Sequence, residues 1–114
     1  MDTINADEII KFLKQDQRHK KKFQYIERLI FGNFRMPDVY DKEEINDRCK
    51  GVTAMKFFKG QENARIYCKE VTGGDKIFVV IAAELLERKK SKKLSKKEIQ
   101  IIEKVASYEY ILET

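Results

Sequence analysis

The chain has 114 residues, of which 42% are hydrophobic and 38% charged, and 24 Lys and Arg against 19 Asp and Glu leave a formal net charge of +5. This length suits a single domain, which we expect to span residues 1–114. The apolar content excludes a wholly disordered chain. The longest uncharged apolar run, residues 77–83, is far shorter than the roughly 20 residues needed to cross a bilayer.

The first eight residues are acidic and lack the basic start and apolar stretch of a secretory signal, so we expect a cytoplasmic protein without membrane contacts. The only cysteines are Cys49 and Cys68, and the only histidine is His19. These counts exclude a disulfide-rich scaffold and a four-ligand zinc site built from Cys and His alone. Gly73 and Gly74 are expected to form a turn, because no helix is predicted directly after them as a phosphate-binding loop would require. We therefore expect no metal and no small-molecule cofactor.

The first half of the chain is predicted to be helical. Apolar residues recur at helical spacing in residues 6–14 and again in residues 16–31. Gly32 is expected to end the second helix in the left-handed conformation. Residues 34–40 form a connection, and the charged residues 41–50 are expected to form one or two helical turns.

The second half changes to the period of β-strands. Residues 52–58, 64–71 and 76–85 are rich in strand-forming side chains and are separated by short segments with turn residues. Such short connections predict an antiparallel meander. The third strand is apolar on both sides, so we expect helices to cover both of its faces.

Alternation along the middle strand predicts two different faces. The small and apolar side chains are expected in the core, whereas the polar ones are expected on a solvent-exposed working face. The first set is Ala64, Ile66 and Cys68, and the second is Arg65, Tyr67 and Lys69.

A last helix is predicted over residues 95–113. Ser95 and Glu98 fit a capping box, in which the serine oxygen accepts a hydrogen bond from a backbone N–H of the first turn. The complete pattern predicts an α+β fold, in which a small antiparallel sheet packs against N-terminal helices and a C-terminal helix.

Positive charge is concentrated in residues 18–22, 56–69 and 88–97, and the last of these segments holds seven Lys or Arg in ten residues. Such clusters supply the salt-sensitive part of nucleic-acid affinity. The alternative is that the lysines only keep the surface soluble.

Three segments, taken in order, resemble the RelE/HigB superfamily of bacterial toxins. They are Ala-Arg-Ile-Tyr at residues 64–67, the apolar strand at 77–83, and the lysine pairs at 89–97 that lead into the capped helix with Glu98 and Ile99. The resemblance covers roughly residues 16–112 and implies a RelE-like fold.

The resemblance also implies an activity. Members are toxins of toxin–antitoxin pairs, and most are ribosome-dependent endoribonucleases, or mRNA interferases, that cut messenger RNA in the ribosomal A site. The expected partners are therefore mRNA on the ribosome and a cognate antitoxin protein. The reaction activates a ribose 2′-OH for attack on the adjacent phosphate, so preorganised cations and a proton-transfer group are needed.

The family's catalytic positions can be matched onto this chain. The arginine of the sheet falls on Arg65, whose planar fork can meet two phosphate oxygens. The basic residue on the preceding strand falls on Lys56, with Lys59 as the alternative.

The remaining catalytic positions fall near the C-terminus. The basic residue beyond the last strand falls on Arg88, or on Lys89, and the proton-transfer residue on Tyr108, or on Tyr110. The residues expected to bind RNA are Lys59, Tyr67, Lys69, Lys89, Lys90, Lys92 and Lys93.

The chain also departs from the family pattern, and two other functions remain possible from the sequence. The one histidine, His19, lies in a predicted helix and is expected on the surface, whereas several family nucleases keep a histidine near the last strand or the C-terminus. The ParE branch of the superfamily blocks DNA gyrase without cutting RNA. A non-catalytic nucleic-acid-binding module would also account for the basic clusters and an exposed Tyr67.

Overall fold

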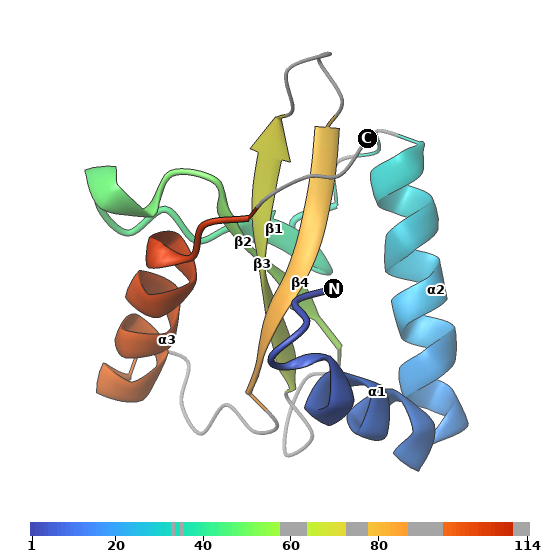
Figure 1. Cartoon of the computed structure of the whole chain (residues 1–114). Coiled ribbons are helices and arrows are strands. Elements are labelled where there is room, and N and C mark those ends of the chain that lie inside the picture. Colours follow the sequence, from blue (N-terminus) through green and yellow to red (C-terminus); the bar gives the residue numbers. More distant parts are fainter. Residues whose placement is uncertain (33, 35, 58–63, 73–77, 87–94, 111–114) are drawn as a thin grey trace.

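The computed structural model describes the chain except for residues 33, 35, 58–63, 73–77, 87–94 and 111–114. The described residues form three α-helices, four strands and one 3-10 turn (Figure 1). The helices are α1 (Ala6–Gln15), α2 (Gln17–Phe31) and α3 (Lys96–Ser107), and the turn is η1 (Asp47–Cys49). The strands are β1 (Tyr40–Lys42), β2 (Val52–Lys56), β3 (Arg65–Thr72) and β4 (Phe78–Leu86).

The strands lie side by side in chain order, β1-β2-β3-β4, and each neighbouring pair is antiparallel. The expected meander of three strands is confirmed, and the coarse α+β fold with it. In Figure 1, α1 and α2 lie on one side of the sheet and α3 on the other. We call these two sides of the sheet the α1/α2 face and the α3 face.

The helices begin where the sequence predicts. The Asp16 side chain accepts a hydrogen bond from Arg18 N (2.8 Å) and caps α2, and Arg18 holds the pKa of that carboxyl down to about 2. Ser95 Oγ accepts from Glu98 N (3.2 Å), so the predicted cap of α3 is also confirmed. The helix α3 ends at Ser107, because Tyr108 takes an extended conformation.

Gly32 ends α2, but the expected left-handed conformation is wrong. Its φ is −81°, and its N–H donates to Arg28 O (3.0 Å). A β-carbon at this position would lie 2.6 Å from the Phe34 ring. Glycine is therefore favoured at this position because a β-carbon would clash with the Phe34 ring, and not because the backbone takes a positive φ.

Residues 41–50 differ from the prediction. Tyr40, Asp41 and Lys42 pair with β2 as the short edge strand β1, and only η1 is helical. A three-residue edge strand carries too few positions to show alternation, which explains why the sequence did not reveal it. Gly51 follows with φ +85° and approaches Glu70 O so closely that a β-carbon would lie 3.0 Å away.

The α1/α2 face buries an almost entirely apolar core. It includes Ala64, just before β3, and Ile66 and Cys68 of β3, all of which were expected inside. Phe12 of α1 stacks on His19, with ring centroids 4.1 Å apart. His19 Nδ1 also lies 2.9 Å from Phe12 O, so this histidine is half-buried between α1 and α2 rather than on the open surface. The fully buried members of this core are Ile9, Phe12, Ile26, Val39, Met55, Phe57, Ala64, Ile66, Cys68 and Ala82.

The α3 face is covered as well, and this corrects a second expectation. Ile102 and Val105 of α3 pack on Tyr67, Ala54 and Ala83 of the sheet. Helices therefore cover both faces of β4, as its two-sided apolar sequence predicted. The face of β3 that was expected to meet solvent lies largely under α3 instead.

Candidate functional site

Two cations lie side by side at one end of the α3 face. Lys56, the last residue of β2, is directly opposite Arg65, the first residue of β3, and Arg65 is in turn opposite Leu86, the last residue of β4. Directly opposite residues share a face of a sheet, and like charges in that position destabilise it. Such a local conflict is typical of a functional site.

Arg65 is held by one acidic side chain. Its Nη1 lies 3.5 Å from Glu43 Oε1, and the two side chains are only 12% and 14% exposed. Its Nε is buried and makes no hydrogen bond within the described part of the chain. Among the described residues, the guanidinium therefore makes one long contact, and its other N–H donors are not used there.

Lys56 has its own partners on the side of β1. Its Nζ donates to Pro37 O (3.0 Å) and lies 3.8 Å from Asp41 Oδ2, with 24% of the side chain exposed. Each cation of the pair thus faces a carboxylate, Glu43 for Arg65 and Asp41 for Lys56. These acids offset the repulsion between the two cations.

Tyr67 is not the exposed stacking platform that the sequence suggested. It is 0% exposed beneath α3, and its hydroxyl finds no hydrogen-bond partner among the described residues. Burial, followed by the charge of Glu98, raises the pKa of this phenol, while Arg65 lowers it. A ring in this position cannot stack on a nucleotide base, because the helix covers it.

Lys69 is also turned inward, toward the C-terminus of α3. Its Nζ donates to Ala106 O (2.9 Å) and to Tyr108 O. These are carbonyls at the end of a helix, where no further turn supplies N–H partners and where a positive charge is favourable. Lys69 therefore caps α3, and alternation alone did not distinguish this role from contact with RNA.

Tyr108 is held by a network at the outer edge of β4. Its hydroxyl donates to Glu84, which also accepts from Asn5 Nδ2 (3.1 Å) and pairs with Lys104 Nζ (3.4 Å). Burial and the hydrogen bond to Glu84 raise the pKa of Tyr108, so its phenol stays protonated at neutral pH. Among the described residues, no contact joins Tyr108 to Lys56 or Arg65. As it stands, the phenol is a proton donor and not a base.

Tyr110, the alternative candidate, continues this arrangement. Its hydroxyl donates to Asp2 Oδ2 (2.6 Å), and its ring packs edge-on against Tyr108 (6.1 Å between centroids). Burial and the bond to Asp2 raise its pKa as well. The segment after α3 is thereby tied to the N-terminus of the chain.

The other predicted site residues lie outside the described residues. They keep their roles as predictions only, and they are Lys59, Arg88, Lys89, Lys90, Lys92 and Lys93.

Sequence reasoning missed Glu43 and Glu84. A search for clusters of basic residues does not consider acidic side chains. Glu43 also lies in a charged stretch that was expected to form helical turns. The only signal was its position three residues after the aromatic Tyr40 and next to a predicted strand, and this signal can be interpreted only once β1 is known to pair with β2.

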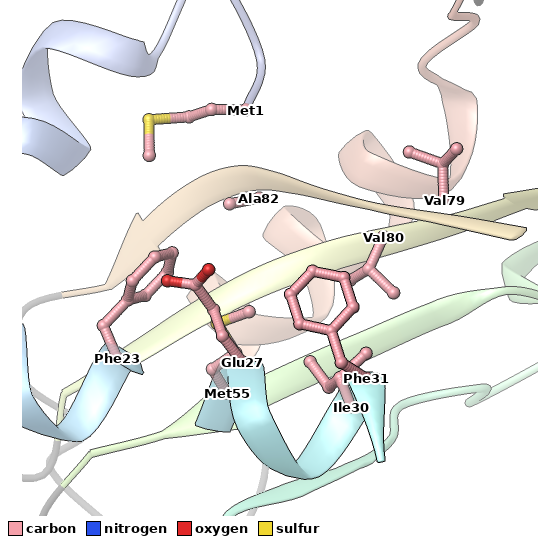
Figure 2. Close-up of a pocket in the computed structure, with 9 residues that line it drawn as sticks. All are labelled: Met1, Phe23, Glu27, Ile30, Phe31, Met55, Val79, Val80 and Ala82. Carbon is pink, nitrogen blue, oxygen red and sulfur yellow. The ribbon is translucent and has the colours of Figure 1, made fainter. Parts of the chain in front are cut away.

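A separate apolar pocket of about 520 Å³ lies on the α1/α2 face, between α2 and β4 (Figure 2). Glu27 is the one charged side chain in its lining, and Phe31, at its rim, is 84% exposed. The lining consists of Met1, Phe23, Glu27, Ile30, Phe31, Met55, Val79, Val80 and Ala82.

None of the described helices is long and apolar enough to span a membrane. Within the described ranges, no group of three or more His, Cys, Asp or Glu side chains could hold a metal ion. Comparison with known proteins gives no further guide, because no family model, no curated protein and no solved structure matches the chain.

Proposed function

We propose that this chain is a RelE-like toxin of a toxin–antitoxin pair that cleaves messenger RNA on the ribosome. In this proposal the whole of residues 1–114 forms the toxin domain, it acts in the cytoplasm, and a cognate antitoxin protein neutralises it. Arg65 stabilises the charge that develops on the phosphoryl group, and Lys56 is the second cation.

The observation that carries the proposal is the pairing of Lys56 and Arg65 at one end of an antiparallel sheet. Two like charges in direct register repel each other and are offset here by Glu43 and Asp41, and in the proposed reaction an RNA phosphate takes over this role. The next strand ends at Leu86 beside Arg65, and in sequence the basic residues from Arg88 onward follow directly. The α+β fold with a meander sheet is compatible with the family resemblance.

The chemistry needs charge stabilisation above all. Attack of a 2′-oxygen on the adjacent phosphate adds negative charge to the phosphoryl oxygens, and preorganised donors that meet this charge lower the barrier. Arg65 enters the reaction with its Nη1 only loosely bound to Glu43 at 3.5 Å. A phosphate that displaces or shares this contact forms a charge-assisted, two-pronged interaction with the guanidinium.

The test is cleavage of a defined mRNA in a purified translation mixture, with and without ribosomes, followed by primer extension. We expect ribosome-dependent cuts by the native chain and a loss of about 10²- to 10³-fold in rate for Arg65→Ala. Arg48→Ala is the matched control, because Arg48 is 83% exposed and its one ion pair among the described residues is with Glu103 at the surface. An intact mRNA at every concentration of the native chain would refute the proposal.

The same preparation separates the alternatives. Inhibition of gyrase supercoiling without mRNA cleavage, unaffected by Arg65→Ala, would identify a ParE-like inhibitor. Salt-sensitive RNA binding without cleavage would identify a nucleic-acid-binding module.

A further inference from the structure

The outer edge of β4 presents backbone groups that point away from the sheet. Val80 is paired with Glu70 of β3, but the Glu70 N–H donates to Gly51 O on the opposite side (2.7 Å). In an antiparallel pair both residues of such a position turn their N–H and C=O outward. The N–H and C=O of Val80 therefore point toward the free edge of β4.

The N-terminus already uses one position of this edge. Asp2 N donates to Ala82 O (2.8 Å), which shows that Ala82, two residues beyond Val80, has the same outward orientation. Phe78, two residues before Val80, must follow the same alternation. Among the described residues nothing hydrogen-bonds to the outward backbone groups of Val80 and Phe78.

The apolar pocket adjoins this free edge. Val80 and Ala82 line it from β4, while Phe23, Ile30 and Phe31 line it from α2 (Figure 2). Phe31 leaves 84% of its surface in water, so part of the apolar lining is open to a partner. A strand added beside β4 would direct every second side chain into this space.

The negative charge of Glu27 indicates which kind of segment would bind in the pocket beside β4. Glu27 carries the one charged side chain of the pocket lining, this side chain extends from α2 toward β4 in Figure 2, and no described residue forms an ion pair with it. A second copy added through its own β4 would bring no cation, since Phe78–Leu86 contains neither Lys nor Arg. A helix would leave the outward N–H and C=O groups of Val80 without partners.

We propose that this edge and pocket dock an extended segment of a partner polypeptide. The segment continues the sheet beside β4, inserts apolar side chains between β4 and α2, and places a Lys or Arg against Glu27. This site lies on the opposite face of the sheet from Arg65, so the docking proposal can be tested independently of the proposed RNA cleavage.

The probe is a synthetic peptide, acetyl-Thr-Val-Thr-Lys-Thr-Val-Thr-amide, titrated into the ¹⁵N-labelled full chain. We expect the amide resonance of Val80 to shift, and binding about tenfold tighter than that of the same peptide with Glu in place of Lys. A peptide N-methylated on its bonding edge should not bind. Equal affinity for the Lys and Glu peptides, binding of the N-methylated peptide, or no shift at millimolar peptide would each overturn the proposal.

Variants of the chain complete the test. Glu27→Gln should abolish the preference for the Lys peptide, and Phe31→Ala should weaken both peptides alike. Glu8→Gln, a change of an exposed acid on α1 outside the pocket, is the control and should leave the preference intact. Retention of the preference in Glu27→Gln would place the cation elsewhere and contradict the assignment.

Discussion

The two faces of the sheet are both covered by helices, but they bury different chemistry. Under α1 and α2 the buried side chains are mostly apolar, and their burial is a source of stability, while the buried Thr53 on this face donates a hydrogen bond to the Tyr40 hydroxyl (2.8 Å). Under α3 the same sheet carries Arg65, Tyr67, Lys69 and Glu84, of which Tyr67 is fully buried and the others partly. Polar groups in such places cost stability unless they are paired. The contrast indicates that the α1/α2 face mainly holds the fold and that the α3 face holds the candidate site.

The largest effect on folding is expected on the α1/α2 face. Ile66→Ala removes a fully buried side chain between β3 and the helix pair and should reduce the free energy of unfolding by about 2–5 kcal/mol. Urea denaturation measures this loss. A change below about 1 kcal/mol would show that this face is not the main source of stability.

The ion pair under α3 should come next. Glu43→Gln leaves the guanidinium of Arg65 largely buried without its carboxylate, so we expect a loss of about 1–3 kcal/mol. The matched change is Glu103→Gln, whose partner Arg48 is 83% exposed, and it should cost less than about 1 kcal/mol. Equal losses for the two variants would contradict the distinction between a buried and a surface pair.

Lys69 should contribute less, because it acts on one helix end. Lys69→Met keeps the aliphatic stem but removes the donor to the carbonyls of Ala106 and Tyr108, which should cost about 1 kcal/mol. Amide hydrogen exchange should show the last turn of α3 opening more often. If the exchange of that turn is unchanged while RNA affinity falls, Lys69 contacts RNA rather than capping the helix.

Tyr67 should show the smallest effect. Tyr67→Phe removes a buried hydroxyl that has no described partner, so stability should stay within about 0.5 kcal/mol or rise slightly. Thermal unfolding checks this, and RNA affinity should not change. A loss of RNA affinity with unchanged stability would restore the stacking role that the sequence suggested.

Much of the fold could be predicted because periodicity and capping are local. The three long strands, the helix starts at Asp16 and Ser95, and the two-sided cover of β4 all follow from side-chain spacing. β1 could not be predicted, since its three residues form a strand only by pairing with β2.

The candidate site was less predictable. Alternation correctly separated Arg65, Tyr67 and Lys69 from the core residues of the α1/α2 face, but it cannot tell a face in water from a face under a distant helix. Whether α3 covers that face depends on long-range packing of Ile102 and Val105. The role of Glu43 likewise depends on contacts between residues 22 positions apart.

The central claim is that the guanidinium of Arg65 stabilises the charged phosphoryl group, and Arg65→Lys tests it most directly. This change keeps the positive charge but removes the planar fork. In single-turnover cleavage of mRNA on the ribosome, we expect the rate to fall by about 10²-fold while RNA affinity changes only a few-fold and the chain still unfolds cooperatively. A cleavage rate equal to that of the native chain would contradict the claim.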